Sequence, residues 1–131
     1  MDDLIAFLNA RLDEGEAAAK AATPGPWVVG RTSGEDGEWN YGSHVAAMGE
    51  EKRMLLDMCT GYTRSKHVGT AEHIALHDPG RALRDVAADR QLLREYDVAY
   101  RTTAQEGLRL AVRIRAAVHS DHPGYRPEWK P

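Results

Sequence analysis

Two histidines and an aspartate come closest, by type and spacing, to a chemical site in this chain. His73 and His77 are four residues apart, which places both rings on one face of a helix, and Asp78 follows at once. Two imidazoles and a carboxylate are a common ligand set for Zn²⁺, and Cys59 or His67 offers a further ligand. A metal ion held there would activate a water molecule. One hypothesis is therefore a metal-dependent hydrolase that uses His73, His77 and Asp78.

The same stretch also has a purely structural explanation, which we favour. Asp78 followed by Pro79 is a strong helix start, because Asp caps unpaired backbone N–H groups and Pro fits the first turn. The order C-x7-H-x5-H-x3-H matches no standard zinc pattern, and Ile74 stands where an HExxH motif has its glutamate. We therefore predict a helix, a sharp junction and a second helix, with no catalytic residue, no metal and no cofactor.

Three aromatic residues form a second candidate site. Trp27, Trp39 and Tyr41 fall in a segment of β-rich composition, and on a small sheet they would form an aromatic surface for a ligand. The alternative is that Trp27 fills the core just after a Pro-Gly-Pro break. The residues that we single out for ligand or partner binding are Trp27, Trp39, Tyr41, His73 and His77.

The first element that must position these residues is a helix. Leu4, Leu8 and Leu12 recur every four residues and predict a helix over residues 1–22. The sequence Thr23-Pro24-Gly25-Pro26 then ends it, because two prolines around a glycine cannot continue the helical hydrogen bonds.

Residues 27–60 predict a small three-stranded antiparallel sheet. The strands are expected at 27–30, 38–48 and 54–59, with a hairpin connection at 49–52. The run 54–59 is also short enough to be part of a helix, and its flanking glycines favour a strand.

Residues 70–118 predict the helical half of the chain. A short helix covers about 70–77, and the next begins at Pro79. Apolar residues then alternate by four and three in a heptad-like seam, which is weakened at Asp89 and across Thr103–Gly107. Either one helix of about 40 residues continues through this region, or two helices meet near 102–107.

The second part of this half is apolar around most of its circumference. Between Leu108 and Val118, Arg109 and Arg113 mark a narrow polar stripe, and the helix over 1–22 offers a single matching stripe. Another subunit is therefore expected to cover the remaining apolar surface, which predicts a homo-oligomer, with a dimer as the first choice. The tail 119–131 is too rich in proline for a helix, and we expect it to dock through Tyr125 and Trp129.

Composition limits the classes of function. The chain has 131 residues, of which 42% are hydrophobic and 28% charged, as in one ordinary α+β domain spanning 1–131. A single cysteine, an acidic start and no long apolar run predict a cytoplasmic protein without a membrane segment. The net charge of −3, with arginines interleaved among acidic residues on the last helices, favours intrahelical ion pairs over nucleic-acid binding.

Four segments in order along the chain carry a resemblance. They are MDDLIAFLNARLDE at the start, ATPGPW at 22–27, HIALHDPGRALRDV at 73–86 and DHPGYRPEW at 121–129. With these segments the chain resembles an uncharacterised family of small actinobacterial proteins, known only as a domain of unknown function. The part from ATPGPW to the helix after Pro79 is also similar to phage-encoded accessory proteins of the Ea22-like group. The resemblance implies an accessory protein of phage or mobile-element type and supplies no functional residues.

The residues and the resemblance together favour a non-catalytic role. We expect an accessory protein that binds a protein partner or a small ligand as a homo-oligomer, and we keep the metal-dependent hydrolase as the alternative.

Overall fold

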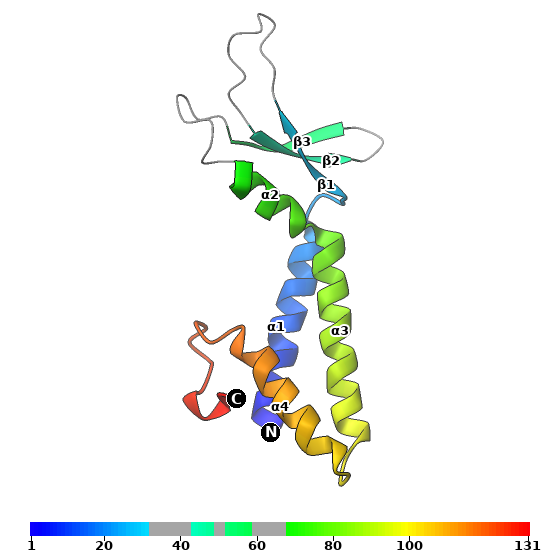
Figure 1. Cartoon of the computed structure of the whole chain (residues 1–131), viewed down its shortest axis with the longest axis vertical. Helices are drawn as coiled ribbons and strands as arrows, with labels where there is room; N and C mark the ends of the chain where they lie inside the picture. Colours follow the sequence, from blue (N-terminus) through cyan, green and yellow to red (C-terminus); the bar gives the residue numbers. More distant parts are fainter. Residues whose placement is uncertain (32–42, 49–51, 59–67) are drawn as a thin grey trace, which may run out of the picture. The chain divides into compact units, whose positions relative to one another are not determined.

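The computed structural model describes residues 1–31, 43–48, 52–58 and 68–131. The chain divides into two compact units: Met1–Ala17 with Leu83–Pro131, and Ala18–Ala82. Figure 1 shows the order of the elements along the chain. They are α1 (Asp2–Ala21), β1 (Trp27–Arg31), β2 (Ser43–Met48), β3 (Lys52–Met58), α2 (Val68–Leu76), α3 (Pro79–Val98), α4 (Ala104–Ala117) and the 3-10 turn η1 (Pro127–Trp129). The expected α+β class is confirmed.

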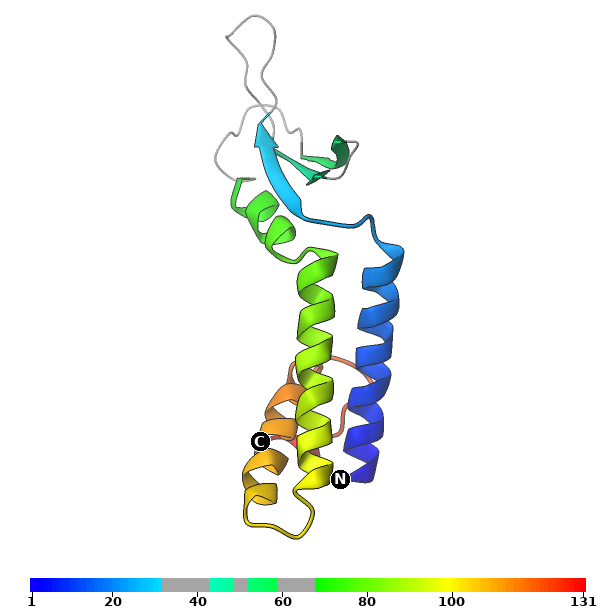
Figure 2. The same cartoon turned by 90° about the vertical axis from the view of Figure 1, so that its right-hand side faces the viewer.

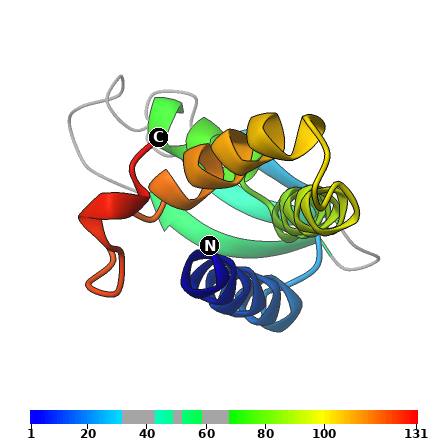
Figure 3. The same ribbon diagram turned by 90° about the horizontal axis from the view of Figure 1, so that it is seen from below.

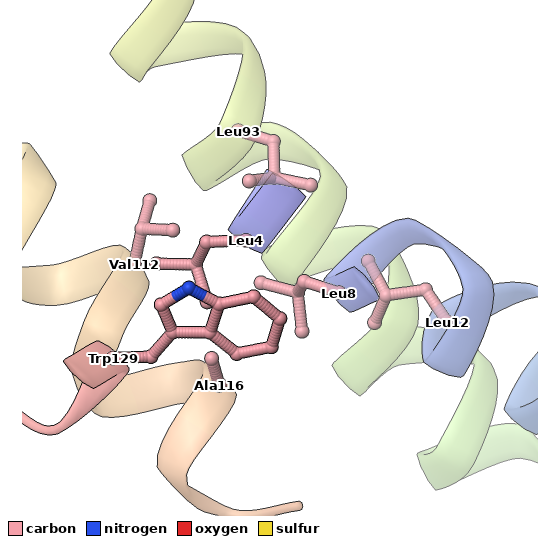
Figure 4. Packing of buried hydrophobic residues seen from close by; sticks show 7 residues of the cluster. All are labelled: Leu4, Leu8, Leu12, Leu93, Val112, Ala116 and Trp129. Carbon is pink, nitrogen blue, oxygen red and sulfur yellow. The ribbon is translucent and has the colours of Figure 1, made fainter. Parts of the chain in front are cut away.

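The first unit is built on the leucine stripe of α1. Leu4, Leu8 and Leu12 are 1%, 0% and 4% exposed, as their four-residue spacing predicts for the buried side of a helix. They pack in one cluster with Leu93 of α3, with Val112 and Ala116 of α4, and with Trp129 of the tail (Figure 4). Figure 3 shows α1, α3 and α4 from below, nearly along the axes of α1 and α3.

The heptad-like segment after Pro79 forms two helices, α3 and α4, and not a single helix of about 40 residues. Helix α3 ends at Val98 and α4 begins at Ala104, close to the weak positions Thr103 and Gly107. Between them Arg101 has a positive φ of 63°, a backbone conformation that a continuing helix does not contain. The chain therefore turns back on itself here, and α4 lies beside α3 rather than extending it (Figure 2).

The second unit contains the strands and α2. Strand β1 pairs antiparallel with β2, with Trp27 opposite Ala47, and β2 pairs antiparallel with β3. The register between β2 and β3 shifts between Val45 and Ala46, which marks a local bulge. Helix α2 packs against β1 and β2, and Ala71 on it is fully buried.

The boundaries differ from the expected ones in small ways. Helix α2 begins at Val68 rather than residue 70, and Lys52, expected in the hairpin connection, already pairs with Met48 in the strand ladder. Only 43–48 of the strand expected at 38–48 is described, so Trp39 and Tyr41 lie outside the described residues. None of the described helices is long and apolar enough to span a bilayer.

Candidate binding sites at the helix junction and on helix α4

Asp78 is the N-cap of α3. Its Oδ1 accepts a hydrogen bond from the backbone N–H of Arg81, the third residue of the helix, at 2.7 Å. Its backbone carbonyl accepts the first helical hydrogen bond, from the N–H of Ala82, at 3.0 Å. Pro79, which has no N–H to satisfy, occupies the first helical position. The predicted cap is thereby confirmed, and this carboxylate is already engaged.

The other oxygen of Asp78 faces a second element of the chain. A Cβ placed on Gly25 would lie 2.7 Å from Asp78 Oδ2, which is closer than two such atoms can approach. The Pro-Gly-Pro break after α1 therefore passes directly against the cap of α3, and only glycine leaves room for the carboxylate. The sequence pattern of each motif alone does not predict that Gly25 meets the Asp78 side chain.

His73 and His77 are brought together near this cap. Their ring centroids are 4.4 Å apart, and both residues are exposed on α2 and the junction. The Nδ1 atom of His77 lies 2.7 Å from the carbonyl oxygen of His73. A carbonyl can only accept, so Nδ1 carries the hydrogen in this contact. The exposed side chain of Leu76, 60% accessible, lies between them in the sequence.

A three-ligand metal centre is not assembled in the part of the chain that the structure describes. Among those residues no group of three or more His, Cys, Asp or Glu side chains is placed to hold an ion. Cys59 and His67, the other ligands considered, lie outside the described residues. What the junction presents is a pair of adjacent imidazoles beside an exposed leucine.

Trp27 is the one described residue of the predicted aromatic surface. It is half-buried at the start of β1, and its indole Nε1 donates a hydrogen bond to the carbonyl of Thr23 at 2.9 Å. This hydrogen bond connects the start of β1 to the residue before the Pro-Gly-Pro break.

Helix α4 has two apolar faces. Val112 and Ala116 are fully buried in the core cluster. Leu110, Ile114 and Val118 follow at four-residue spacing on a different side of the helix, and they are 50%, 51% and 64% exposed. We call these three residues the outer stripe. The sequence predicts an apolar surface on residues 108–118 that the rest of the chain does not cover, and the outer stripe is part of that surface.

An ion pair between Arg115 and Asp89 joins α4 to α3. Arg115 donates from Nε to Asp89 Oδ1 at 2.5 Å and from a terminal nitrogen to Oδ2 at 2.7 Å. Asp89 is only 8% exposed. The hydrogen bond that Arg115 donates to Asp89 raises the pKa of Arg115; burial opposes this rise, and the negative charge of Asp89 adds to it. In the sequence, Asp89 interrupts the apolar seam, and a carboxylate at such a position indicates a cationic partner nearby.

Some arginines of α3 and α4 bridge helices, in addition to the intrahelical pairing that the sequence predicts. Arg90 of α3 contacts Asp13 and Glu16 of α1 at 2.8 and 2.6 Å. The hollow beside it is lined by Glu16, Leu83, Val86, Ala87, Arg90 and Arg94. The Arg90 guanidinium in this hollow is paired with the two carboxylates of α1. The intrahelical pair of Arg109 with Glu106 is long, at 3.6 Å.

The comparison with known families supports the first of the two resemblances, the one to a family of unknown function. The sequence model of a family of unknown function, DUF6221, matches residues 1–131, the full length of the chain. The chain belongs to this family. All four segments that carried the resemblance fall within the match. No curated protein and no solved structure matches the chain.

Proposed function

We propose that this DUF6221 chain is a non-catalytic accessory protein that binds a protein partner or a small ligand and works as a homo-oligomer. The observation that carries the proposal is the outer stripe of α4. Three large apolar side chains at helical spacing, each at least half exposed, remain on a helix whose other apolar face already fills the core. Leaving such a stripe in water costs free energy that burial in an interface recovers.

The junction is the surface that we assign to the partner or ligand. His73, Leu76 and His77 are exposed, and Asp78, which follows them in the sequence, is held by its cap hydrogen bond. Two imidazoles and an apolar side chain at a capped helix start suit recognition better than chemistry. The phage or mobile-element setting rests on the resemblance of the ATPGPW and Asp-Pro motifs, and the single cysteine favours a reducing compartment such as the cytoplasm.

Two measurements test this proposal. Light scattering of the purified chain gives its mass in solution, and the proposal expects more than one copy. Co-purification from the native host with the wild type and with a His73→Ala, His77→Ala double variant then tests the junction. A protein or small molecule retained by the wild type and lost from the double variant supports the proposal, whereas equal retention contradicts the assignment of the junction.

The second candidate is a metal-dependent hydrolase that uses His73, His77 and Asp78. The observation in its favour is the histidine pair, with ring centroids 4.4 Å apart, in which the contact of His77 with the His73 carbonyl uses Nδ1 and not Nε2. Elemental analysis separates the candidates: stoichiometric zinc or manganese that is lost on His73→Ala supports the hydrolase, and its absence from the wild type supports the binding protein.

A further inference from the structure

We propose that α4 packs antiparallel against α4 of a second copy, across a two-fold axis near Leu110. This inference rests on the homo-oligomer proposed above and specifies its interface. The outer stripe supplies the apolar centre of the contact, since Leu110 and Ile114 are both about half exposed in the single chain.

Gly107 lies on the same side of α4 as the outer stripe, three residues before Leu110 and seven before Ile114. A Cβ added to it would meet no atom within 4 Å, so nothing within the described chain explains a glycine at this helical position. Glycine inside a helix costs about 1 kcal/mol relative to alanine. Close approach of another backbone is one physical reason to accept this cost. In the antiparallel register, Ile114 of one copy packs over Gly107 of the other.

The charges at the border of the stripe fix the orientation. Glu106 and Arg113 are seven residues apart, so they lie on the same border of the outer stripe. When two identical helices pack antiparallel, the same borders face each other, and Glu106 of each copy then faces Arg113 of the other. In a parallel pair, opposite borders meet, and the other border carries Arg115, which Asp89 already holds.

Both charges have capacity for a partner. The side chain of Glu106 is 76% exposed, and its contact with Arg109 is long at 3.6 Å. The Nη1 atom of Arg113 donates one long hydrogen bond, 3.4 Å, to the carbonyl of Lys130 at an exposed position. A carboxylate from the second copy would satisfy this guanidinium better than a single carbonyl does.

The size of the contact sets the affinity that we expect. One pair of four-turn helices buries on the order of 1,000 Å², at the small end of specific protein interfaces. We therefore expect a dimer that dissociates in the micromolar range, and sedimentation velocity over a concentration series is the suitable measurement.

The first variant is Gly107→Arg, which has free space in the single chain and blocks the approach of a second helix. It should weaken dimerisation by about 100-fold or more while the helical circular dichroism is kept. Ala88→Arg is the matched control, because Ala88 is an exposed small residue on α3, and it should leave dimerisation unchanged.

The charge pair gives a second test that does not depend on packing. Glu106→Arg and Arg113→Glu should each weaken the homodimer by about tenfold at low salt, since like charges then face each other. Mixing the two single variants should produce a heterodimer, and the double variant should dimerise like the wild type.

The outcomes separate this inference from the proposed function. A wild type that stays monomeric up to its solubility limit overturns the homo-oligomer and this interface together. A wild-type dimer that Gly107→Arg leaves intact overturns the α4 interface alone. Loss of the dimer in Gly107→Arg without heterodimer formation in the mixture overturns the antiparallel orientation.

Discussion

Asp89 on α3 and Arg115 on α4 are joined by two parallel hydrogen bonds of 2.5 and 2.7 Å at the edge of the helical core. The pair joins α4 to α3 on the side of α4 that carries Arg115. With Arg115 held by α3, Val112 and Ala116 point into the core, and Leu110 and Ile114 are left facing solvent. The side of α4 that packs in the single chain is therefore different from the side that we propose for contact with a second copy.

The two partners of this pair should respond differently to removal. The side chain of Asp89 is 11% exposed and that of Arg115 is 42% exposed. Arg115→Met leaves a buried carboxylate without a cation and should cost about 2 kcal/mol, whereas Asp89→Leu leaves an arginine that water can reach and should cost clearly less. Urea unfolding of both variants measures this, and equal losses would show that the pair is not buried as described.

The contact between Gly25 and Asp78 predicts a strong non-additivity. Gly25→Ala puts a methyl group against Oδ2 of Asp78 and should displace the cap, at a cost of about 1–2 kcal/mol, while Asp78→Ala should cost about 1 kcal/mol through loss of the cap itself. In the double variant the clash is absent, so the two losses should not add. Asp78→Asn should be nearly neutral, because an amide oxygen can also cap. A fully additive double variant would contradict the close approach.

The tail should contribute to stability through Trp129. Its indole is 8% exposed and its ring centroid lies 5.1 Å from that of Phe7, the only phenylalanine of the chain. Figure 4 shows the indole between the leucines of α1 and the small residues of α4. Trp129→Ala should therefore cost about 3 kcal/mol in free energy of unfolding. A thermal unfolding midpoint equal to that of the wild type would mean that the tail does not dock in solution.

His119 should make the stability depend on pH. Burial lowers its pKa below the usual 6.5, and the charges of Arg11 and Arg115 lower it further. The unfolded chain therefore binds a proton on His119 that the folded chain does not, and stability should fall as the pH decreases below about 6.5. His119→Gln removes the titrating group and should flatten this part of the profile. Thermal unfolding between about pH 7.5 and 5 checks it, and an unchanged profile would count against the lowered pKa.

The sequence predicts those features that depend on local patterns. Leu4, Leu8 and Leu12 identify the buried side of α1 because helical periodicity is local, and Asp78-Pro79 identifies the start of α3 because capping involves the next three residues only. The sequence does not decide whether α3 and α4 are one helix or two, since Thr103 and Gly107 weaken the apolar seam without predicting the backbone turn at Arg101.

The features that the sequence could not predict depend on partners distant along the chain. Asp89 and Arg115 are 26 residues apart, and nothing in either helix alone selects the other. Gly25 and Asp78 meet only because the fold returns the junction to the break after α1. At the candidate site, the spacing of His73 and His77 predicted adjacent rings, but the engagement of Asp78 as a cap required the hydrogen-bond geometry.

The most direct test of the central claim is the mass of the protein in dilute solution, compared between the wild type and Ile114→Asp. The account predicts that the wild type approaches twice the chain mass of 14.5 kDa as its concentration rises. Ile114→Asp should remain folded and monomeric, because its carboxylate is exposed in the single chain and would be buried unpaired only in the dimer. A wild type that scatters as a single 14.5 kDa chain at every concentration would contradict the claim.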